Sequence, residues 1–443
     1  MSHEGELKQK TISVEEAVEK IPSNGYVYTY GCSAEPWTFL ENMHLLKGKR
    51  ENVTIVNFLN SKPFDYYTDD SYRGVINNES MFCNRFLIES QKKGMNSFIP
   101  VHLRNSGTDR SVYHKNTGKP LRAYVIYGTP MDKHGYISTG TVAMSNRRLV
   151  HEADLVMVEI NENLPYTYGD SYLHISEVDY VFAGKNRLCY LPEKPMDETD
   201  VAIGNYIADL IENRSTIQLG IGGIPNAVAA ALKDKRDLGV HTEMLNDGIV
   251  QLYKAGVVTN RYKQTYPGKI VTTFTFGNKE TYDFIDGNVG VLHLDVAHTN
   301  DPHMIAKNEK IVSVNTTLSV DLYGQCVSES IGNLQISGSG GQVDFVMGAK
   351  QSFGGKSIIA LHSTAMIKDK NGERERVSSI VGIHPAGTII TLSRTDIDFV
   401  VTEYGVAALR GAPLSERAKS LIAIAHPDFR EELTAEAKRN YLL

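Results

Sequence analysis

Short runs of β-branched and aromatic residues alternate with helical patterns along this 443-residue chain, and the alternation limits the fold more than any other feature. Runs of this length suit buried strands, and the intervening helical stretches can return the chain in the same direction. The pattern predicts an α/β fold with open, largely parallel sheets. The expected strands span residues 26–30, 53–58, 123–127, 155–160, 217–219, 270–276, 311–314, 358–361 and 399–401.

A proline-bearing, acidic stretch at residues 191–200 separates the first four expected strands from the last five. A helical pattern follows at 201–212, which fits the start of a new folding unit. Because domains usually contain about 100 to 200 residues, a chain of this length favours two or three of them. We predict an N-terminal α/β domain at 1–199 and a C-terminal α/β domain at 200–443.

The two halves share an ordered set of local features. Residues 31–36 (GCSAEP) follow a strand and precede a helix, as residues 220–225 (GIGGIP) do in the second half. The turn sequence Asp132-Lys-His-Gly135 likewise resembles Asp321-Leu-Tyr-Gly324. The echo predicts two similar domains with a ligand-binding cleft between them. A chance match of common turns is the alternative.

Charge and cysteine content narrow the class of protein. The 46 basic and 52 acidic residues are interspersed and leave a formal net charge of -6, so no basic block indicates a nucleic-acid or membrane partner. The four cysteines lie far apart without a CxxC pair, which argues against a disulfide framework or a zinc ribbon. With no apolar leader and no apolar stretch of about 20 residues, we expect a cytoplasmic protein.

A glycine turn stands out in residues 215–232 (STIQLGIGGIPNAVAAAL), between an expected strand and a helix expected to begin at Pro225. Its glycines let backbone N–H groups approach an oxyanion or a phosphate, and the helix dipole adds partial positive charge. No Gly-Lys-Ser/Thr follows, and the third glycine of the dinucleotide fingerprint is missing. An anion site and an ordinary tight turn both fit these residues.

Glu243, in residues 238–248 (LGVHTEMLNDG), stands at the apparent end of another strand. In open α/β sheets ligands gather beyond the carboxyl ends of the strands, and a carboxylate there can attack a carbonyl to form a covalent intermediate. The alternative is a glutamate in the first turn of a helix, where the helix dipole favours it.

Three other patterns carry weaker signals. A second glycine cluster in residues 335–345 (QISGSGGQVDF) can present backbone donors, or it can form a hairpin or a bulge. His174 and Glu177 have the spacing of two metal ligands on one helical face, but no third ligand is evident, so we predict no metal site. We interpret Met244 and Trp37 as packing residues.

Five of these segments, taken in order, resemble the motifs of the acetyl-CoA hydrolase/transferase family of class I CoA-transferases. Within that family the chain is similar to 4-hydroxybutyrate CoA-transferases and then to butyryl-CoA:acetate CoA-transferases, with residues 168–170 (YGD) and 174–179 (HISEVD) favouring the former. The five segments are 220–228 (GIGGIPNAV), 241–248 (HTEMLNDG), 338–345 (GSGGQVDF), 401–405 (VTEYG) and 425–430 (AHPDFR).

The resemblance implies a role for each candidate residue. Glu243 becomes the catalytic nucleophile, and residues 31–36 help to shape the acid pocket. Relatives often carry a lysine near Met366 and Asp-Tyr where this chain has Ala297 and His298, so contacts to the tail of coenzyme A (CoA) are not carried over. The implied oxyanion-hole and CoA contacts are Gly220, Ile221, Gly222, Gly223, Ile224, Gly340 and Gly341.

The resemblance also implies a ping-pong reaction that moves CoA from 4-hydroxybutyryl-CoA or butyryl-CoA to a short carboxylate such as acetate, through a glutamyl-CoA thioester. CoA is then a substrate, no metal or redox cofactor is required, and the chain is expected to form a homodimer. Two alternatives stay open. An acyl-CoA hydrolase would use water as the acceptor, and a nucleotide-binding oxidoreductase or regulatory module is disfavoured by the missing third glycine.

Overall fold

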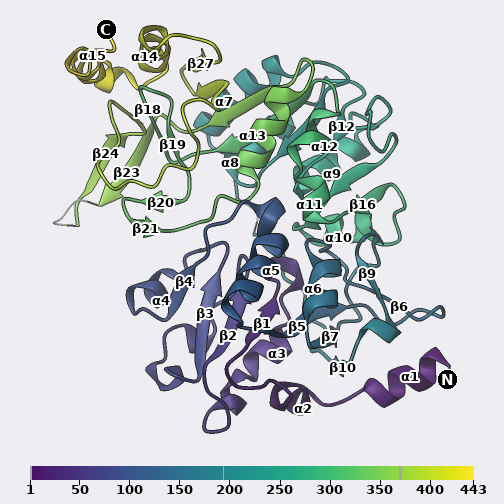
Figure 1. Ribbon diagram of the computed structural model, residues 1–443. Coiled ribbons are helices and arrows are strands. Elements are labelled where there is room, and N and C mark those ends of the chain that lie inside the picture. Colours follow the sequence, from purple (N-terminus) through teal and green to yellow (C-terminus); the bar gives the residue numbers. More distant parts are fainter. Residues whose placement is uncertain (1, 193, 369–371) are drawn as a thin grey trace.

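The structure, a computed structural model, describes residues 2–192, 194–368 and 372–443. Its strands gather in two main sheets, one from each half of the chain, with helices packed around them (Figure 1). The N-terminal half, purple and blue, lies below the green and yellow C-terminal half in that view. The predicted α/β fold with two open, largely parallel sheets is confirmed.

The first main sheet has seven parallel strands in the order β10-β7-β5-β1-β2-β3-β4. Its central strands are almost wholly buried, as expected for a parallel sheet covered on both faces. The strands are β1 (Tyr26–Thr29), β2 (Val53–Asn57), β3 (Ile76–Ser80), β4 (Asn96–Phe98), β5 (Leu121–Gly128), β7 (Leu155–Ile160) and β10 (Tyr180–Ala183). The helices of this half are α1 (His3–Lys10), α2 (Val14–Glu19), α3 (Trp37–Glu41), α4 (Ile88–Lys92), α5 (Ser106–Thr117) and α6 (Asn146–Glu152).

The second main sheet has the order β12-β11-β17-β22-β26-β27, parallel except for the antiparallel β26–β27 pair at its edge. Its strands are β11 (Thr216–Leu219), β12 (Gly239–Val240), β17 (Ile311–Thr316), β22 (Lys356–Ala360), β26 (Phe399–Thr402) and β27 (Gly405–Ala408). The helices of this half are α7 (Glu198–Leu210), α8 (Gly223–Ala231), α9 (Asp247–Lys254), α10 (Lys279–Ile285), α11 (Val296–Thr299), α12 (Pro302–Ala306), α13 (Gln342–Gln351), α14 (Leu414–Ala423) and α15 (Arg430–Arg439).

Smaller sheets and ladders complete the fold, and one of them joins the two halves. In that sheet β8 (Tyr168–Gly169) pairs with β16 (Val291–His293), which pairs with β14 (Ile270–Thr272). The division at residues 199 and 200 stays a prediction. The other small strands are β6 (Tyr136–Ser138), β9 (Tyr172–His174), β13 (Met244–Leu245), β15 (Phe274–Thr275), β18 (Ser319–Asp321), β19 (Cys326–Val327), β20 (Ser330–Ile331), β21 (Leu334–Gln335), β23 (Thr364–Lys368), β24 (Arg374–Ser378) and β25 (Ile380–Val381).

The predicted strands are confirmed, but the structure differs from the prediction in one strand and at the start of one helix. All nine runs form strands, but the run at 270–276 splits into β14 and β15. The helix expected to begin at Pro225 begins at Gly223, because Gly222, at φ 113°, turns the chain directly into α8. Pro225 then lies within the first four helical positions, whose N–H groups have no partner inside the helix, so the ring costs no hydrogen bond there.

The two halves repeat the turns that the sequence pattern indicated. Asp132 accepts hydrogen bonds from the N–H groups two and four residues further on, at 2.8 and 2.9 Å. Asp321 does the same at 3.1 and 2.8 Å, and Gly135 and Gly324 both have positive φ. The matching turn sequences of the two halves therefore adopt the same local structure.

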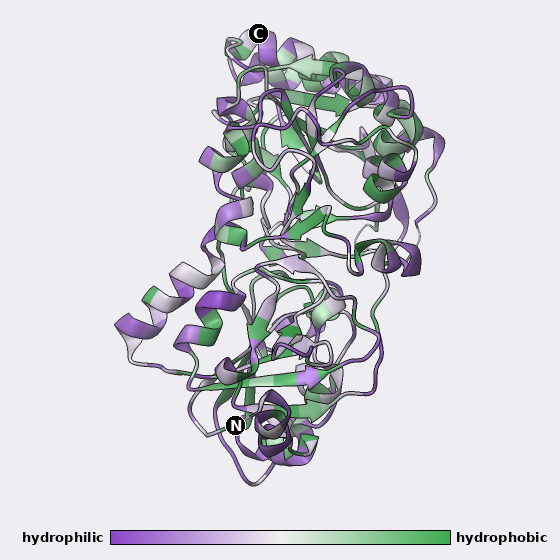
Figure 2. Ribbon diagram, turned by 90° about the vertical axis from the view of Figure 1, so that its right-hand side faces the viewer, coloured by the Kyte–Doolittle hydropathy of each residue, from purple (hydrophilic) through white to green (hydrophobic). Residues whose placement is uncertain are grey.

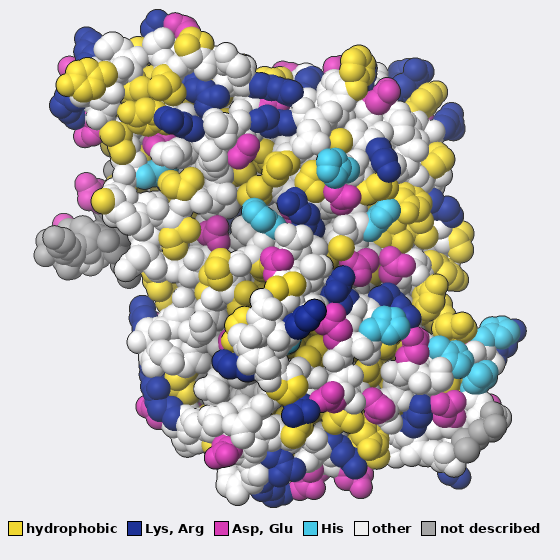
Figure 3. Space-filling view, viewed as in Figure 1, with side chains coloured by type: hydrophobic (Ala, Val, Ile, Leu, Met, Phe, Trp, Pro, Cys, Tyr) yellow, Lys and Arg dark blue, Asp and Glu magenta, His cyan; other side chains and the backbone are white. Residues whose placement is uncertain are grey.

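Hydrophobic side chains fill the interior of both halves, and the surface carries mixed charge. Figure 2 shows mostly green strands inside each half, and around them helices that carry both purple and green residues. Figure 3 shows basic and acidic side chains interspersed over one face. No helix within the described residues is long and apolar enough to cross a membrane.

Candidate active site

Glu243 lies between β12 and β13, on a segment whose backbone is held firmly. Its carbonyl oxygen accepts hydrogen bonds from the N–H groups of Thr273 and Phe274, at 3.0 and 3.2 Å, and from the Thr272 hydroxyl at 3.0 Å. Helix α9 begins only at Asp247, so Glu243 does not belong to the first turn of a helix. The fixed backbone gives the Glu243 side chain a defined starting point.

Two donors hold the Glu243 carboxylate. Asn300 Nδ2 donates to Oε2 at 2.6 Å, and the Gly341 N–H also hydrogen-bonds the carboxylate. Burial raises the pKa of Glu243 to about 7; the nearby Asp344 charge raises it too, and the two donors lower it. A carboxylate with this pKa exists in both protonation states near neutral pH.

Asn300 is itself positioned by neighbouring groups. His241 is fully buried and contacts the Thr299 carbonyl oxygen through Nε2 at 2.8 Å. Burial lowers the pKa of His241 to about 3, so the ring is neutral and its Nε2–H donates to that carbonyl. The Asn300 amide also hydrogen-bonds Asp344, and it therefore lies between two carboxylates. The motif histidine thus supports the residue that holds Glu243.

An ion pair ties the two halves of the chain together beside the site. Arg104 Nη1 lies 2.6 Å from Oδ1 of Asp344, which is completely buried on α13. Burial raises the pKa of Asp344 to about 6, and the Arg104 charge lowers it. Removing one partner of such a pair would leave the other buried without compensation, so the pair fixes the halves relative to each other.

The second glycine cluster packs against the first half rather than forming a hairpin or a bulge. The Leu103 N–H donates to the Gly340 carbonyl at 3.2 Å. A Cβ at Gly341 would stand 2.0 Å from Glu243 Oε2, and a Cβ at Gly338 would stand 2.7 Å from a backbone carbonyl oxygen of the first half. Glycine is therefore required at Gly338 and Gly341 because other groups approach closely.

Three neighbouring cavities surround Glu243. The Glu243 cavity, of about 120 Å³, is lined by Phe58, Leu59, Phe82, Gln218, Leu219, Gly220, Ile221, Glu243, Met244, Phe274, Asn315, Gly341, Gln342 and Phe345. The turn cavity, of about 480 Å³, is lined by Lys194, Asp200, Ile221, Gly222, Gly223, Ile224, Pro225, Thr316, Thr317, Leu318, Ala360, Leu361, His362, Thr364, Ala365, Met366 and Ser379. The Cys32 cavity, of about 450 Å³, is lined by Cys32, Leu59, Asn60, Ser61, Phe82, Cys83, Asn84, Arg85, Phe86, Cys189, Tyr190, Pro192, Phe276, Ile336 and Ser337.

The cavities share wall residues. Ile221 belongs to both the Glu243 cavity and the turn cavity, whereas Leu59 and Phe82 separate the Glu243 cavity from the Cys32 cavity. The catalytic candidate thus stands between two larger spaces, each big enough for part of a substrate.

The expected contact residues fall into two groups. Gly220, Ile221 and Gly341 line the Glu243 cavity, and Gly340 lies just behind it, where an added Cβ would be 3.6 Å from the Glu243 carboxylate. Gly222, Gly223 and Ile224 line the turn cavity instead. The glycine turn therefore faces the neighbouring space, and only its start reaches the Glu243 cavity.

The sequence interpretation missed several polar residues of the site. Gln218 on β11 and Asn315 on β17 line the Glu243 cavity, and their side chains hydrogen-bond each other at 3.2 Å. Each places an amide side chain within a buried strand rich in β-branched residues, and this is a signal that could have found them. Asn300 offered no such signal, because it follows a short helix in a polar loop.

Other clusters that could hold a ligand have their polar groups engaged within the protein. Asp197, Asp200 and His362 place one atom each within 4.8 Å of the others, but the aspartates cap α7 and His362 hydrogen-bonds Asp200. His174 and Glu177, considered above as a metal pair, form a capping box of their own.

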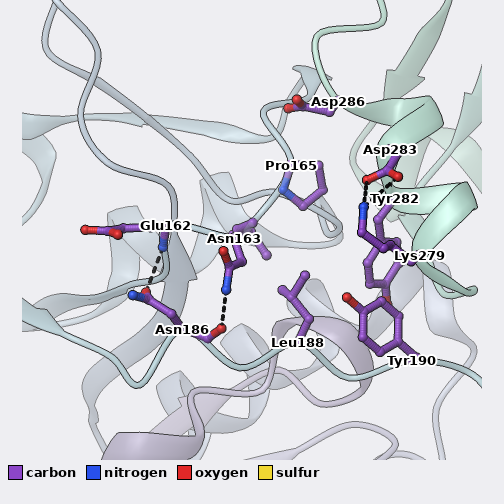
Figure 4. A pocket seen from close by; sticks show the side chains of 11 residues that line it. Glu162, Asn163, Pro165, Asn186, Leu188, Tyr190, Lys279, Tyr282, Asp283 and Asp286 are labelled. Atoms are coloured by element: carbon purple, nitrogen blue, oxygen red, sulfur yellow. Dashed lines mark hydrogen bonds and ion pairs between the residues drawn. The ribbon is translucent and has the colours of Figure 1, made fainter.

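A fourth cavity lies beside α10 and shares Tyr190 with the Cys32 cavity (Figure 4). Its volume is about 450 Å³. Lys279 is paired with Asp283 at 2.7 Å, and the Tyr190 ring stacks on Tyr282. Asp286 accepts a hydrogen bond from the Tyr166 N–H, so the charges of Lys279, Asp283 and Asp286 are already engaged within the protein.

Known proteins resemble the chain along its whole length. The acetyl-CoA hydrolase/transferase N-terminal and C-terminal domain models match residues 1–190 and 277–437. The chain is 40% identical to succinyl-CoA:cyclohexane-1-carboxylate CoA transferase of Geobacter metallireducens, over 99% of this chain and 97% of that protein. It is 38% identical to 4-hydroxybutyrate coenzyme A transferase of Clostridium kluyveri, over 100% of both chains.

A solved structure has the same architecture. RipA from Yersinia pestis superposes with a TM-score of 0.91 at 33% identity, over 100% of both chains. The two domain models match on either side of the Glu243 segment, and the curated relatives cover the segment itself. On these full-length likenesses, the chain belongs to the acetyl-CoA hydrolase/transferase family.

Proposed function

We propose that the chain transfers CoA between an acyl-CoA, such as 4-hydroxybutyryl-CoA or butyryl-CoA, and a short carboxylate such as acetate, with Glu243 as the nucleophile. That the chain is a CoA-transferase rests on its full-length transferase relatives. One observation carries the assignment of the nucleophile. The Glu243 carboxylate stands in a small, largely apolar cavity between two larger ones, where one substrate part can enter from each side.

The reaction proceeds in two matched halves. A Glu243 oxygen attacks the thioester carbonyl carbon, the C–S bond breaks, and an acyl-glutamyl anhydride and CoA thiolate result. The thiolate then attacks the glutamyl carbonyl carbon, releasing the first carboxylate and leaving a glutamyl-CoA thioester. A second carboxylate attacks that thioester, and the same steps in reverse transfer CoA to it.

Each addition places negative charge on a carbonyl oxygen, which requires preorganised donors. The Gly341 N–H and the Asn300 amide already face the Glu243 carboxylate. They can stabilise an oxyanion that forms at the glutamyl carbon. Gly220, Ile221, Gly222, Gly223 and Ile224, in the turn that leads into α8, stay the proposed contacts to the thioester oxygen and to CoA, and Gly340 a backbone contact beside Gly341.

The apolar lining of the Glu243 cavity favours transfer over hydrolysis. Phe58, Phe274 and Phe345 give the cavity an apolar wall, which supplies no group to activate a water beside the glutamyl carbon. A carboxylate that brings its own chain into the Cys32 cavity would be held in place. An acyl-CoA hydrolase is the second candidate, and it is distinguished by turnover in the absence of any added acid.

The test is the intact mass of the protein after brief incubation with butyryl-CoA, followed by peptide mapping. We expect a CoA adduct on Glu243 and none in Glu243→Gln, with turnover lowered by at least about 10³-fold. Glu159→Gln is a matched control, because Glu159 is also buried with a pKa raised to about 7 but lines none of the three cavities. Turnover retained by Glu243→Gln would refute the assignment.

The proposal extends to the location of the enzyme in the cell and to its oligomeric state. We place the enzyme in the cytoplasm, where its free cysteines would stay reduced. We also propose a homodimer, and a reaction in which CoA is a substrate and no metal or redox cofactor takes part. Size-exclusion chromatography with light scattering tests the dimer, and full activity after treatment with a chelator tests the absence of a metal.

A further inference from the structure

The Cys32 cavity has a polar side that the proposed chemistry does not use. Leu59 and Phe82, which also line the Glu243 cavity, form its wall toward Glu243, whereas Asn60, Ser61, Asn84 and Arg85 supply polar groups elsewhere. An acid whose reacting carboxyl group lies at Glu243 would extend its chain past Leu59 and Phe82 into this cavity. Its far end would then meet the polar groups.

Arg85 is the unpaired cation of this cavity. Its side chain is exposed, and no salt bridge or hydrogen bond joins it to another described residue; the ring of Phe86 lies 4.9 Å from its guanidinium carbon. By contrast, the buried Glu35 carboxylate nearby already accepts hydrogen bonds from Asn60, Ser61 and Trp37. An arginine left without a counter-ion at the wall of a cavity is available to a ligand.

Hydrogen bonds hold the backbone of the segment that carries Arg85. Asn84 Nδ2 donates to the Asn60 carbonyl at 2.6 Å, and Asn84 Oδ1 accepts from the Phe86 N–H at 3.0 Å. The Cys83 N–H donates to the Ser337 carbonyl of the second half at 3.2 Å. Arg85 therefore leaves a backbone that is fixed on both sides, which lowers the entropy cost of using it for recognition.

Two other lining residues of the Cys32 cavity carry backbone strain. Cys32 and Leu59 both have positive φ, at 52° and 50°, although neither is glycine. Such residues store backbone strain and persist where the surrounding structure demands them, often at ligand sites. Both line the Cys32 cavity, which agrees with a binding role for this space.

We propose that Arg85 is a specificity-determining residue that recognises the far end of the acyl chain. The substrates favoured are short acids whose distal end carries a hydrogen-bond acceptor, either a second carboxylate or a hydroxyl group. This inference rests on the proposed function, because it requires the acyl chain to start at Glu243. A distal carboxylate makes the stronger contact, since a charge-assisted hydrogen bond exceeds a neutral one.

The test compares acyl donors of matched length. Succinyl-CoA and butyryl-CoA differ only at the distal end, where one has a carboxylate and the other a methyl group, and 4-hydroxybutyryl-CoA supplies a neutral acceptor. For each donor, kcat/KM for formation of the glutamyl-CoA adduct is measured in wild type, Arg85→Met and Arg85→Lys. Arg73→Met is the control, because Arg73 is exposed in the same half, is paired with Asp70 and lines none of the three cavities.

We expect Arg85→Met to reduce the preference for a polar distal end over butyryl-CoA on the order of tenfold. Arg85→Lys should keep part of the preference and Arg73→Met all of it. Added salt should weaken the succinyl preference but not the hydroxybutyryl preference, and this separates the two acceptors. A preference unchanged in Arg85→Met overturns the inference, whereas the absence of an adduct with every donor overturns the proposed function instead.

Discussion

The two strand-to-helix turns have opposite surroundings. After β1, residues 31–36 are completely enclosed, and the N–H groups of Thr38 and Phe39 at the start of α3 donate to the buried Glu159 carboxylate at 3.1 and 3.0 Å. After β11, residues 220–225 reach an open cavity, Ile221 is 41% exposed, and no side chain of the N-cap residue closes α8. The first turn is satisfied by the protein's own carboxylate, and the second leaves its donors to a ligand.

The glycines at the two turns differ for the same reason. A Cβ at Gly31 would stand 1.9 Å from the Phe58 carbonyl oxygen, so crowding alone requires glycine there. A Cβ at Gly222 would meet nothing within 4 Å, and only its φ of 113° requires glycine. One turn supports the wall of the Cys32 cavity, and the other faces the space proposed for CoA.

The largest predicted effect is a difference in folding stability between substitutions at the two glycines. Gly31→Ala must displace a backbone carbonyl and should destabilise the fold by about 3 kcal/mol. Gly222→Ala meets only backbone strain and should cost about 1 kcal/mol, while weakening the reaction with acyl-CoA. Urea unfolding of both variants measures the difference. Equal losses of stability would mean that the second turn is as enclosed as the first.

The next effect separates two glutamates of similar acidity. Burial raises the pKa of both Glu243 and Glu159 to about 7, but only Glu243 is proposed to react. Because the nucleophile must be ionised, kcat/KM for adduct formation should rise about 50-fold between pH 5 and pH 7 and then level off. Glu159→Gln should leave that profile in place. A flat profile between pH 5 and pH 7 would contradict the role of Glu243.

The local sequence was sufficient to predict the strands of the two main sheets, because strand formation there depends on residues that are neighbours along the chain. The β-branched runs formed strands because burial on both faces selects such residues, as in β2 and β17. The run at 270–276 splits into two strands because of tertiary contacts. The N–H groups of Thr273 and Phe274 donate to the Glu243 carbonyl, and the Thr273 carbonyl accepts from Ala143 of the first half, so one ladder cannot continue through Thr273.

Of the proposed site, the sequence could indicate only the parts that a single segment carries. Glu243 and the glycine turn lie in continuous motifs, so their residues could be named from the sequence. Asn300, Asp344 and Arg104 come from three separate elements, and only packing of the two halves brings them to one carboxylate. Their spacing along the chain does not indicate that these three residues lie close together.

The smallest predicted effect uses a parallel between two buried glutamates, Glu35 and Glu243. Asn60 Nδ2 donates to the buried Glu35 at 2.9 Å, as Asn300 Nδ2 donates to Glu243 at 2.6 Å. Since Asn300 stabilises the ionised form of Glu243, Asn300→Ala should raise the pKa above 7. A rise of about one unit would lower kcat/KM at pH 7 about fivefold and leave the value above pH 9 much less affected.

Asn60→Ala is the matched control, because it removes the same amide from the glutamate that does not react. It should alter the Cys32 cavity, and with it the choice among acids, while the pH profile keeps its midpoint near 7. The pair of profiles therefore assigns each asparagine to one glutamate. A midpoint that moved equally in both variants would mean that the two carboxylates share one electrostatic environment, and the contrast between the two glutamates would then fail.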